Sequence, residues 1–191
     1  GNFTTAHNFG TDSNNTQSVA VGDMDGDGDL DIIAGNPAQS VLCLNDGGGN
    51  FTAARNFGTA SDNTESVAVG DMDGDGDLDI IAGNDGRQNV VYLNDGGGNF
   101  TAARNFGTGG DYTRSVAVGD MDGDGDLDII TGNNHQQDVV YLNDGGGNFT
   151  AARNFGTVSD FTWSVAVGDM DGDGDLDIFA GNLGGQSMVY L

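Results

Sequence analysis

The sequence contains no lysine and carries little positive charge of any kind. Its 191 residues include 5 basic and 30 acidic residues, for a formal net charge of −25. A surface this acidic repels nucleic acids and anionic membranes, so we expect no nucleic-acid partner and no membrane insertion. The length suits a single domain with a core of its own, and we expect one domain over residues 1–191.

Cysteine and long apolar runs are scarce as well. Cys43 is the single cysteine, which excludes an intramolecular disulfide, and the corresponding residue of later repeats is Tyr92, Tyr141 or Tyr190. We therefore expect Cys43 to be a strand residue and not a nucleophile. No apolar run approaches the roughly 20 residues of a membrane-spanning helix. The chain starts at Gly1 with neither Met nor a signal peptide, as expected for a mature or trimmed protein.

What the sequence has instead is one unit repeated four times, at about residues 1–48, 49–97, 98–146 and 147–191. Each unit contains the same nine residues, Asp-Met-Asp-Gly-Asp-Gly-Asp-Leu-Asp, at 23–31, 71–79, 120–128 and 169–177. We refer to these nonapeptides as the aspartate loops.

The aspartate loops have the spacing of a calcium site. Ca²⁺ takes about 6–8 oxygen ligands at roughly 2.3–2.6 Å, and alternate residues of a tight loop direct carboxylates toward one centre. Mg²⁺ fits less well because it requires a small octahedral shell. The loops differ from an EF-hand, since Ala34 stands where its position-12 glutamate would be.

We therefore predict about four bound Ca²⁺, one per repeat. The alternative, an acidic turn that binds no ion, leaves five aspartates in nine residues to repel one another. The predicted metal-site residues are Asp23, Asp25, Asp27, Asp29, Asp31, Asp71, Asp73, Asp75, Asp77, Asp79, Asp120, Asp122, Asp124, Asp126, Asp128, Asp169, Asp171, Asp173, Asp175 and Asp177.

Each unit also predicts four short strands, which in the first unit are residues 18–22, 30–35, 41–44 and 51–57. Glycine-rich turns between β-branched runs indicate antiparallel hairpins, and no helix pattern is present. Units of this length are too long for a solenoid coil, and apolar runs such as Ile32-Ile33-Ala34 suit sheets buried on both faces. We therefore predict an all-β fold, a β-propeller of four near-identical four-stranded blades.

The two ends of the sequence suggest how the propeller closes. Residues 2–9 resemble the fourth strand of the other units, and the chain stops at Leu191 before a fourth strand of the last unit. We expect the N-terminal strand to complete the last blade, because this pairs edges that would otherwise stay open. The alternative is an eight-bladed ring built from two chains, so the protein is expected to be a monomer or a strand-sharing homodimer.

The loop phrase, followed by Val-Tyr-Leu-Asn-Asp-Gly-Gly-Gly-Asn-Phe, resembles the FG-GAP-like or VCBS-type repeat of integrin α-chain propellers and many secreted bacterial proteins. The resemblance covers essentially the whole chain. It implies that loop positions 1, 3, 5 and 9, with the position-7 carbonyl, ligate Ca²⁺. The chain departs from the family pattern in lacking Gly-Ala-Pro after Phe-Gly, and in having four units where the family usually forms seven-bladed rings.

The units are almost constant elsewhere and vary mainly in two places, just before the first strand and just after the second strand of each unit. In a four-stranded meander both places lie at the end of the blade opposite the aspartate loops. Several of the variable residues are aromatic or arginine, types enriched in recognition hot spots. The predicted ligand-binding residues are Asn15, Gln17, Asn63, Glu65, Arg87, Tyr112, Arg114, His135, Phe161 and Trp163.

These patterns predict a secreted, calcium-stabilised binding module for a carbohydrate, since some fungal lectins look similar, or for a protein. Loops this open would fill at the higher calcium concentration outside cells. The alternative is an engineered or recently duplicated scaffold with no specific ligand, self-assembling or structural, whose surface loops have drifted. We do not expect an enzyme, because the carboxylates are committed to metal and neither His7 nor His135 has a repeated catalytic companion.

Overall fold

The computed structural model describes residues 4–9 and 15–191, and this part of the chain forms strands, turns and bends without any helix. The strands are β1 (Ser18–Gly22), β2 (Asp31–Gly35), β3 (Ser40–Asn45), β4 (Phe51–Phe57), β5 (Thr64–Gly70), β6 (Asp79–Asn84), β7 (Asn89–Asn94), β8 (Phe100–Phe106), β9 (Thr113–Gly119), β10 (Asp128–Asn133), β11 (Asp138–Asn143), β12 (Phe149–Phe155), β13 (Thr162–Gly168), β14 (Asp177–Asn182) and β15 (Met188–Tyr190).

The strands form four separate antiparallel sheets in chain order. Three sheets have four strands each, β1 to β4, β5 to β8 and β9 to β12, and the fourth contains β13 to β15. The register repeats from sheet to sheet, so that Val19 pairs with Ala34 in the first as Val67 pairs with Ala82 in the second. The all-β propeller architecture predicted from the sequence is confirmed.

The hydrophobic core lies between the blades. The second strand of each inner blade is fully covered, since every residue of β6 and of β10 is buried. Met24, Ile33 and Leu42 of the first blade form one cluster with Val67 and Ile80 of the second. Each sheet therefore contributes side chains from both faces, which explains why these strands read as continuous apolar runs.

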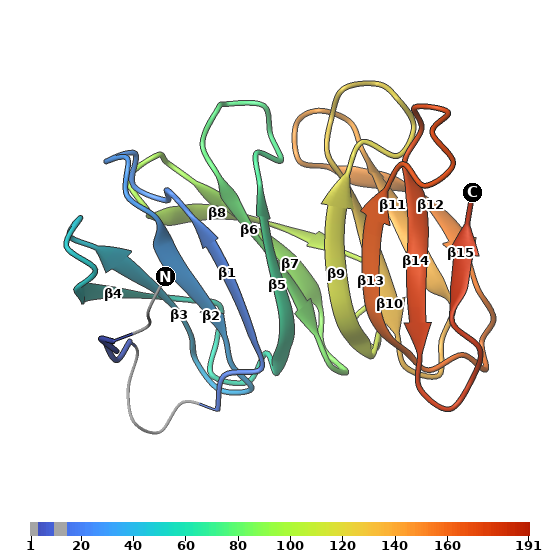
Figure 1. Ribbon diagram of the computed structural model, residues 1–191, viewed down its shortest axis with the longest axis horizontal. Helices are drawn as coiled ribbons and strands as arrows, with labels where there is room; N and C mark the ends of the chain where they lie inside the picture. The colour runs from blue at the N-terminus through green and yellow to red at the C-terminus, as the bar shows by residue number, and fades with distance from the viewer. Residues whose placement is uncertain (1–3, 10–14) are drawn as a thin grey trace.

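Neighbouring blades pack through their first strands, β1 against β5, β5 against β9 and β9 against β13. The first and last blades lie at opposite ends of this series (Figure 1). Residues 4–9 form no strand, and Asn2 and Phe3 of the expected N-terminal strand lie outside the described residues. Completion of the last blade by this segment therefore stays a prediction.

Cys43 is buried in β3, as expected for a strand residue. Within the described residues, no helix is long and apolar enough to span a membrane.

The loops divide between the two ends of the blades. The loops that follow β5, β9 and β13 project together at the upper edge of Figure 1. The turn after β3 lies at the same end as the first aspartate loop, because the Asn45 N–H donates to Asp31 Oδ1 over 2.8 Å. The segments before each first strand and after each second strand meet at the opposite end, where Arg87 Nε donates to the Ser61 carbonyl over 3.2 Å. We refer to these segments together as the variable end.

Candidate functional site

Position 1 of each aspartate loop organises the turn itself. In the first loop, Asp23 Oδ1 accepts the Gly26 N–H at 2.9 Å and Oδ2 accepts the Gly28 N–H at 3.0 Å. Gly26 and Gly28 have φ of 75° and 93°, a left-handed region that glycine enters without a Cβ penalty. Asp27 Oδ1 accepts the Asp29 N–H at 2.9 Å and completes the turn. The alternating Asp-Gly sequence therefore winds the chain around its own carboxylates.

Position 9 ties the loop to the rest of the blade. Asp79 is fully buried, and its carboxylate accepts the Met72 N–H at 2.8 Å and the Asn94 N–H at 2.8 Å. Burial raises the pKa of Asp79 to about 6, and these two hydrogen bonds oppose the rise. Burial likewise raises the pKa of Asp31 and Asp128. A cation placed beside this carboxylate would lower the free-energy cost of ionising it.

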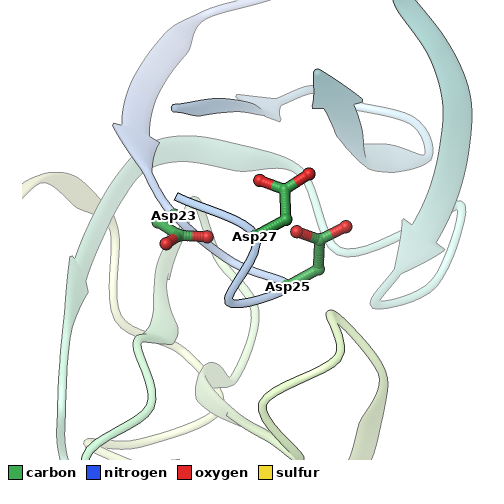
Figure 2. A group of neighbouring side chains, drawn as sticks. All are labelled: Asp23, Asp25 and Asp27. Atoms are coloured by element: carbon green, nitrogen blue, oxygen red, sulfur yellow. The ribbon is translucent and has the colours of Figure 1, made fainter. Parts of the chain in front are cut away.

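The carboxylates of each loop converge. In the first loop Asp23, Asp25 and Asp27 each offer a carboxylate oxygen, and these oxygens lie within 4.8 Å of one another (Figure 2). In the other loops positions 1, 3 and 9 form the group. These groups are Asp71 with Asp73 and Asp79, Asp120 with Asp122 and Asp128, and Asp169 with Asp171 and Asp177.

The donor set fits a hard cation. Asp25 Oδ1 and Asp73 Oδ1 are buried and have no hydrogen-bond partner within the described residues. Burial, followed by the charge of Asp75, raises the pKa of Asp73. A buried anionic oxygen without a donor is unfavourable, and a divalent cation bound between such oxygens removes that cost. Carboxylates and carbonyls are the ligands that Ca²⁺ prefers.

Position 7 behaves differently from the other aspartates. A Cβ added at Gly47 would lie 2.5 Å from Asp29 Oδ2, so the Asp29 side chain lies against the turn after β3. Asp77 and Asp126 stand in the same relation to Gly96 and Gly145. None of these side chains belongs to the converging groups. The predicted ligand at position 7 is the main-chain carbonyl, and this stays a prediction.

The remaining predicted position-5 aspartates, Asp75, Asp124 and Asp173, belong to the same loops but not to the groups of three. Asp75 Oδ1 and Asp124 Oδ1 accept the N–H of position 7 at 2.9 and 3.0 Å, as Asp27 does. Asp173 accepts the Asp175 N–H at 3.0 Å. They therefore shape the loop from a position next to the candidate cation site.

At the variable end, one row of side chains crosses the first strands of successive blades. Arg114 on β9 contacts Glu65 on β5, with Nη1 3.3 Å from Oε2, and Asp85, with Nη2 3.0 Å from Oδ2. Its guanidinium carbon lies 5.5 Å from the ring centroid of Trp163 on β13. Trp163 itself is 55% exposed. Arg114 is thus held by two carboxylates beside an aromatic ring that remains open to solvent.

The other predicted residues surround this row. The Tyr112 N–H donates to Gln136 Oε1 at 2.9 Å, and its ring is exposed. The His135 and Phe161 rings meet edge to face, with centroids 3.9 Å apart. Asn63 Nδ2 reaches the Asp85 carbonyl at 3.4 Å.

Three predicted residues stand apart from the row. Asn15 and Gln17 are exposed in the segment that precedes β1. Arg87 is exposed and held by the Ser61 carbonyl. The structure therefore groups Glu65, Arg114 and Trp163, and leaves the first-blade positions outside that group.

Sequence reasoning left out two residues that the structure places in this cluster, Asp85 and Gln136. Both belong to the segments that differ between units, so unit-to-unit variation was the signal that could have identified them. A pocket of about 380 Å³ also lies beside Phe161, lined by Ser159, Asp160, Asn182 and residues 183–185. Leu183 in its wall is 60% exposed.

Four antiparallel blades, each with a converging aspartate loop at the same end, define a repeat β-propeller with four candidate cation sites. The FG-GAP-like repeat matches the chain three times, at residues 23–82, 71–131 and 126–180. These matches span most of the sequence, and the chain belongs to the FG-GAP-like repeat family. None of the curated proteins matches it.

Several solved structures share the fold. A lectin from Agrocybe aegerita that specifically recognises non-reducing terminal N-acetylglucosamine is 28% identical, with a TM-score of 0.57, and the match covers 84% of this chain and 45% of the lectin. The Vibrio cholerae biofilm matrix protein Bap1 is 21% identical, with a TM-score of 0.56, over 85% of this chain and 23% of Bap1.

BBS1N, solved in complex with ARL6DN, is 11% identical, with a TM-score of 0.61, over 87% of this chain and 50% of BBS1N. Bap1 and BBS1N show similarity of fold alone. The chain spans half or less of the length of each of these three proteins.

Proposed function

We propose that the chain is a calcium-stabilised binding module that holds a carbohydrate at its variable end. The observation that carries the proposal is the exposed Trp163 ring beside Arg114, which Glu65 and Asp85 hold in place. Sugars present apolar ring faces together with hydroxyl groups, so an aromatic face next to fixed charged groups matches both parts of a sugar. An anchored side chain also loses little rotamer freedom when a ligand binds.

Two polar atoms of this cluster have no hydrogen-bond partner among the described residues. These atoms are Asp85 Oδ1 and Arg114 Nε, and both are buried. One accepts and the other donates, which suits a hydroxyl group that does both. A water molecule that bridges these atoms to a bound sugar hydroxyl would satisfy them.

The lectin from Agrocybe aegerita supports the carbohydrate class and suggests the first sugar to test, terminal N-acetylglucosamine. The aromatic residues of the variable end are concentrated in the third and fourth blades, which favours one site over four equivalent sites. Recognition of a protein, the other class expected from the sequence, would use the same residues and is separated from carbohydrate binding by the experiment below.

In this proposal the cations have a structural role and the module is not an enzyme. Calcium at the converging carboxylates would fix the hairpin between the first two strands of each blade. Loops exposed to solvent hold calcium best where its concentration is high, so we place the protein outside the cell.

The test is a panel of soluble glycans that includes terminal N-acetylglucosamine, titrated calorimetrically in calcium. We expect one glycan class to bind, and Trp163→Ala to weaken its binding about 10-fold or more, equivalent to about 1.4 kcal/mol. Thr101→Ala, an exposed change on β8 away from the variable end, is the matched control and should bind like the wild type. Absence of binding to every glycan, or unchanged binding by the Trp163 variant, would contradict the proposal.

A further inference from the structure

The contact between neighbouring blades repeats with the same partners along the chain. Ser18 Oγ on β1 accepts the Val67 N–H of the next blade at 3.1 Å. Ser66 accepts from Val116, and Ser115 from Val165, each also at 3.1 Å. Each blade thus has a forward face that presents the serine and a rear face that presents the valine.

The forward face also has a glycine that receives a leucine. A Cβ added at Gly22 would lie 2.8 Å from Leu78 Cδ1 of the next blade. A Cβ added at Gly70 would likewise lie 2.8 Å from Leu127 Cδ1, and one at Gly119 would lie 2.8 Å from Leu176 Cδ1. The missing side chain at each glycine makes room for the leucine of the following blade.

The forward face of the last blade has the same residues without their partners. A Cβ added at Gly168 would meet nothing within 4 Å, and one at Gly181 would meet only Ser164 of its own sheet. The equivalent Gly83 and Gly132 meet Val116 and Val165 of the next blade, at 2.7 and 2.9 Å. The last blade is therefore shaped to receive a further blade, which the described residues do not supply.

The rear face of the first blade shows the complementary half. Leu30 is 60% exposed, although the equivalent leucines are packed in the glycine sites. Val19 is 56% exposed, whereas its counterparts in the other blades, Val67, Val116 and Val165, are each 7% exposed. The rear face is therefore an apolar surface that is buried in the second, third and fourth blades and exposed in the first.

We propose that these two end faces bind each other between two copies of the chain, the last blade of one copy receiving the first blade of the other. Ser164, Gly168 and Gly181 would meet Val19 and Leu30 of the second copy in the contacts already repeated within the chain. All five residues are uncharged, although Leu30 belongs to the first aspartate loop and Gly168 directly precedes the fourth.

The open edge of the last sheet fits the same occupant. The third strand of each complete sheet pairs with a fourth, as β3 pairs with β4 from Ser40↔Phe57 onward. β15 has no such neighbour within the described residues, and its Met188 and Val189 are 42% and 45% exposed. Residues 4–9, which match the fourth-strand sequence, reach this edge from the second copy.

A head-to-tail contact forms a closed ring when the rotation closes and a filament when it does not. We infer closure with two copies, the smallest ring of copies in which both end faces of every chain are covered. The dimer would present two variable ends. This inference does not depend on the ligand, and it is tested without one.

The experiment is the mass in solution by light scattering, in calcium and at physiological salt. We expect a particle of twice 19.5 kDa. Val19→Asp places a charge in the rear face, and Gly168→Phe fills the glycine site of the forward face. Each should give a particle of 19.5 kDa that still shows the β-sheet circular dichroism of the wild type. Val158→Asp, at a valine that is 66% exposed in the loop before β13, is the matched control and should remain dimeric.

A mixture of the two variants tests the head-to-tail arrangement. The Val19 variant keeps a normal forward face and the Gly168 variant keeps a normal rear face, so the mixture should regain dimers joined at one interface. A wild-type mass of 19.5 kDa, a filament, or a Val19→Asp variant that stays dimeric would each overturn the proposal.

Discussion

The two ends of each blade differ in whether their contacts repeat from blade to blade. At the aspartate loops every blade repeats one hydrogen-bond pattern, with the position-1 carboxylate accepting two glycine N–H groups. At the variable end each blade makes its own contacts, and the ion pairs of Arg114 with Glu65 and Asp85 have no counterpart among the described residues of the first blade. Repetition at one end and difference at the other indicate that stability and specificity are separated in space.

This separation has a physical basis. The aspartate loop is a closed turn in which the carboxylates accept main-chain N–H groups of the loop itself, so few substitutions at these positions are tolerated. The variable end is made of exposed segments before and after strands, where side chains change without disturbing the sheets. Changes at the loop end should therefore cost stability, and changes at the variable end should cost little stability.

Removing calcium should have the largest effect. Each site would stabilise the fold by about 2.7 kcal/mol at a free calcium concentration 100 times its dissociation constant. At about 2–4 °C per kcal/mol for a chain of this size, several sites together should raise the melting temperature by about 10 °C or more. The measurement is thermal unfolding by circular dichroism with calcium and with excess chelator.

Two variants of the third loop sharpen this prediction. Asp122→Ala removes a carboxylate from a converging group, so calorimetry should count about three calcium ions instead of four. Asp126→Ala changes a side chain outside that group and keeps its carbonyl, so the count should stay at four. Equal melting temperatures with calcium and with chelator would contradict the structural role of the ion.

A smaller effect on stability, which depends on pH, is expected at Asp138 between the third and fourth blades. Asp138 is buried, and its carboxylate accepts the Asn133 N–H at 2.7 Å and the Thr162 hydroxyl at 2.6 Å. Burial raises its pKa from 3.8 to about 6. The folded protein thus favours protonated Asp138, and this contribution to stability is complete below about pH 4 and is lost as the pH rises through 6.

Asn89 occupies the equivalent place between the second and third blades. Its side chain accepts the Asn84 N–H at 2.8 Å and donates to the Thr113 hydroxyl at 2.9 Å. Asp138→Asn should reproduce these bonds without a buried charge, and so raise the free energy of unfolding by about 1 to 2 kcal/mol at pH 7. The gain, measured by denaturant unfolding in calcium, should vanish near pH 4. A gain that is the same at both pH values would contradict this account, and Asn89→Asp should show the opposite change.

Much of this architecture could be predicted from the sequence, because each feature occurs in all four repeats. Alternating Asp-Gly at 23–31 predicts a turn that closes on its own carboxylates, and the structure has that turn. The strands follow from short β-branched runs between glycine-rich turns. The position-9 aspartate was predicted as a ligand, but its two hydrogen bonds to distant N–H groups depend on how the hairpins pack.

The variable end was only partly predictable, because its contacts also depend on how the blades pack. Variation between units marked Glu65, Arg114 and Trp163 as candidates, but it did not show that they form one row. That row arises because the first strands of successive blades lie side by side. Asp85 joins it from the segment after β6, a contact between parts of the chain that no local pattern encodes.

The smallest effect on stability is expected at the centre of this row. Arg114 is 19% exposed in its side chain and pairs with two carboxylates that are equally accessible. Ion pairs near the surface contribute about 0 to 1 kcal/mol each, so Arg114→Ala should lower the free energy of unfolding by about 1 kcal/mol or less. Denaturant unfolding in calcium measures this change.

The same variant should nevertheless weaken glycan binding, because it removes the group that lies beside the Trp163 ring and frees Glu65 and Asp85 to repel each other. Arg87→Ala is the matched control, since Arg87 is also at the variable end but lies outside the row. If Arg114→Ala destabilised the protein as strongly as calcium removal does, this row would belong to the scaffold, and the division between the two ends of the blade would be wrong.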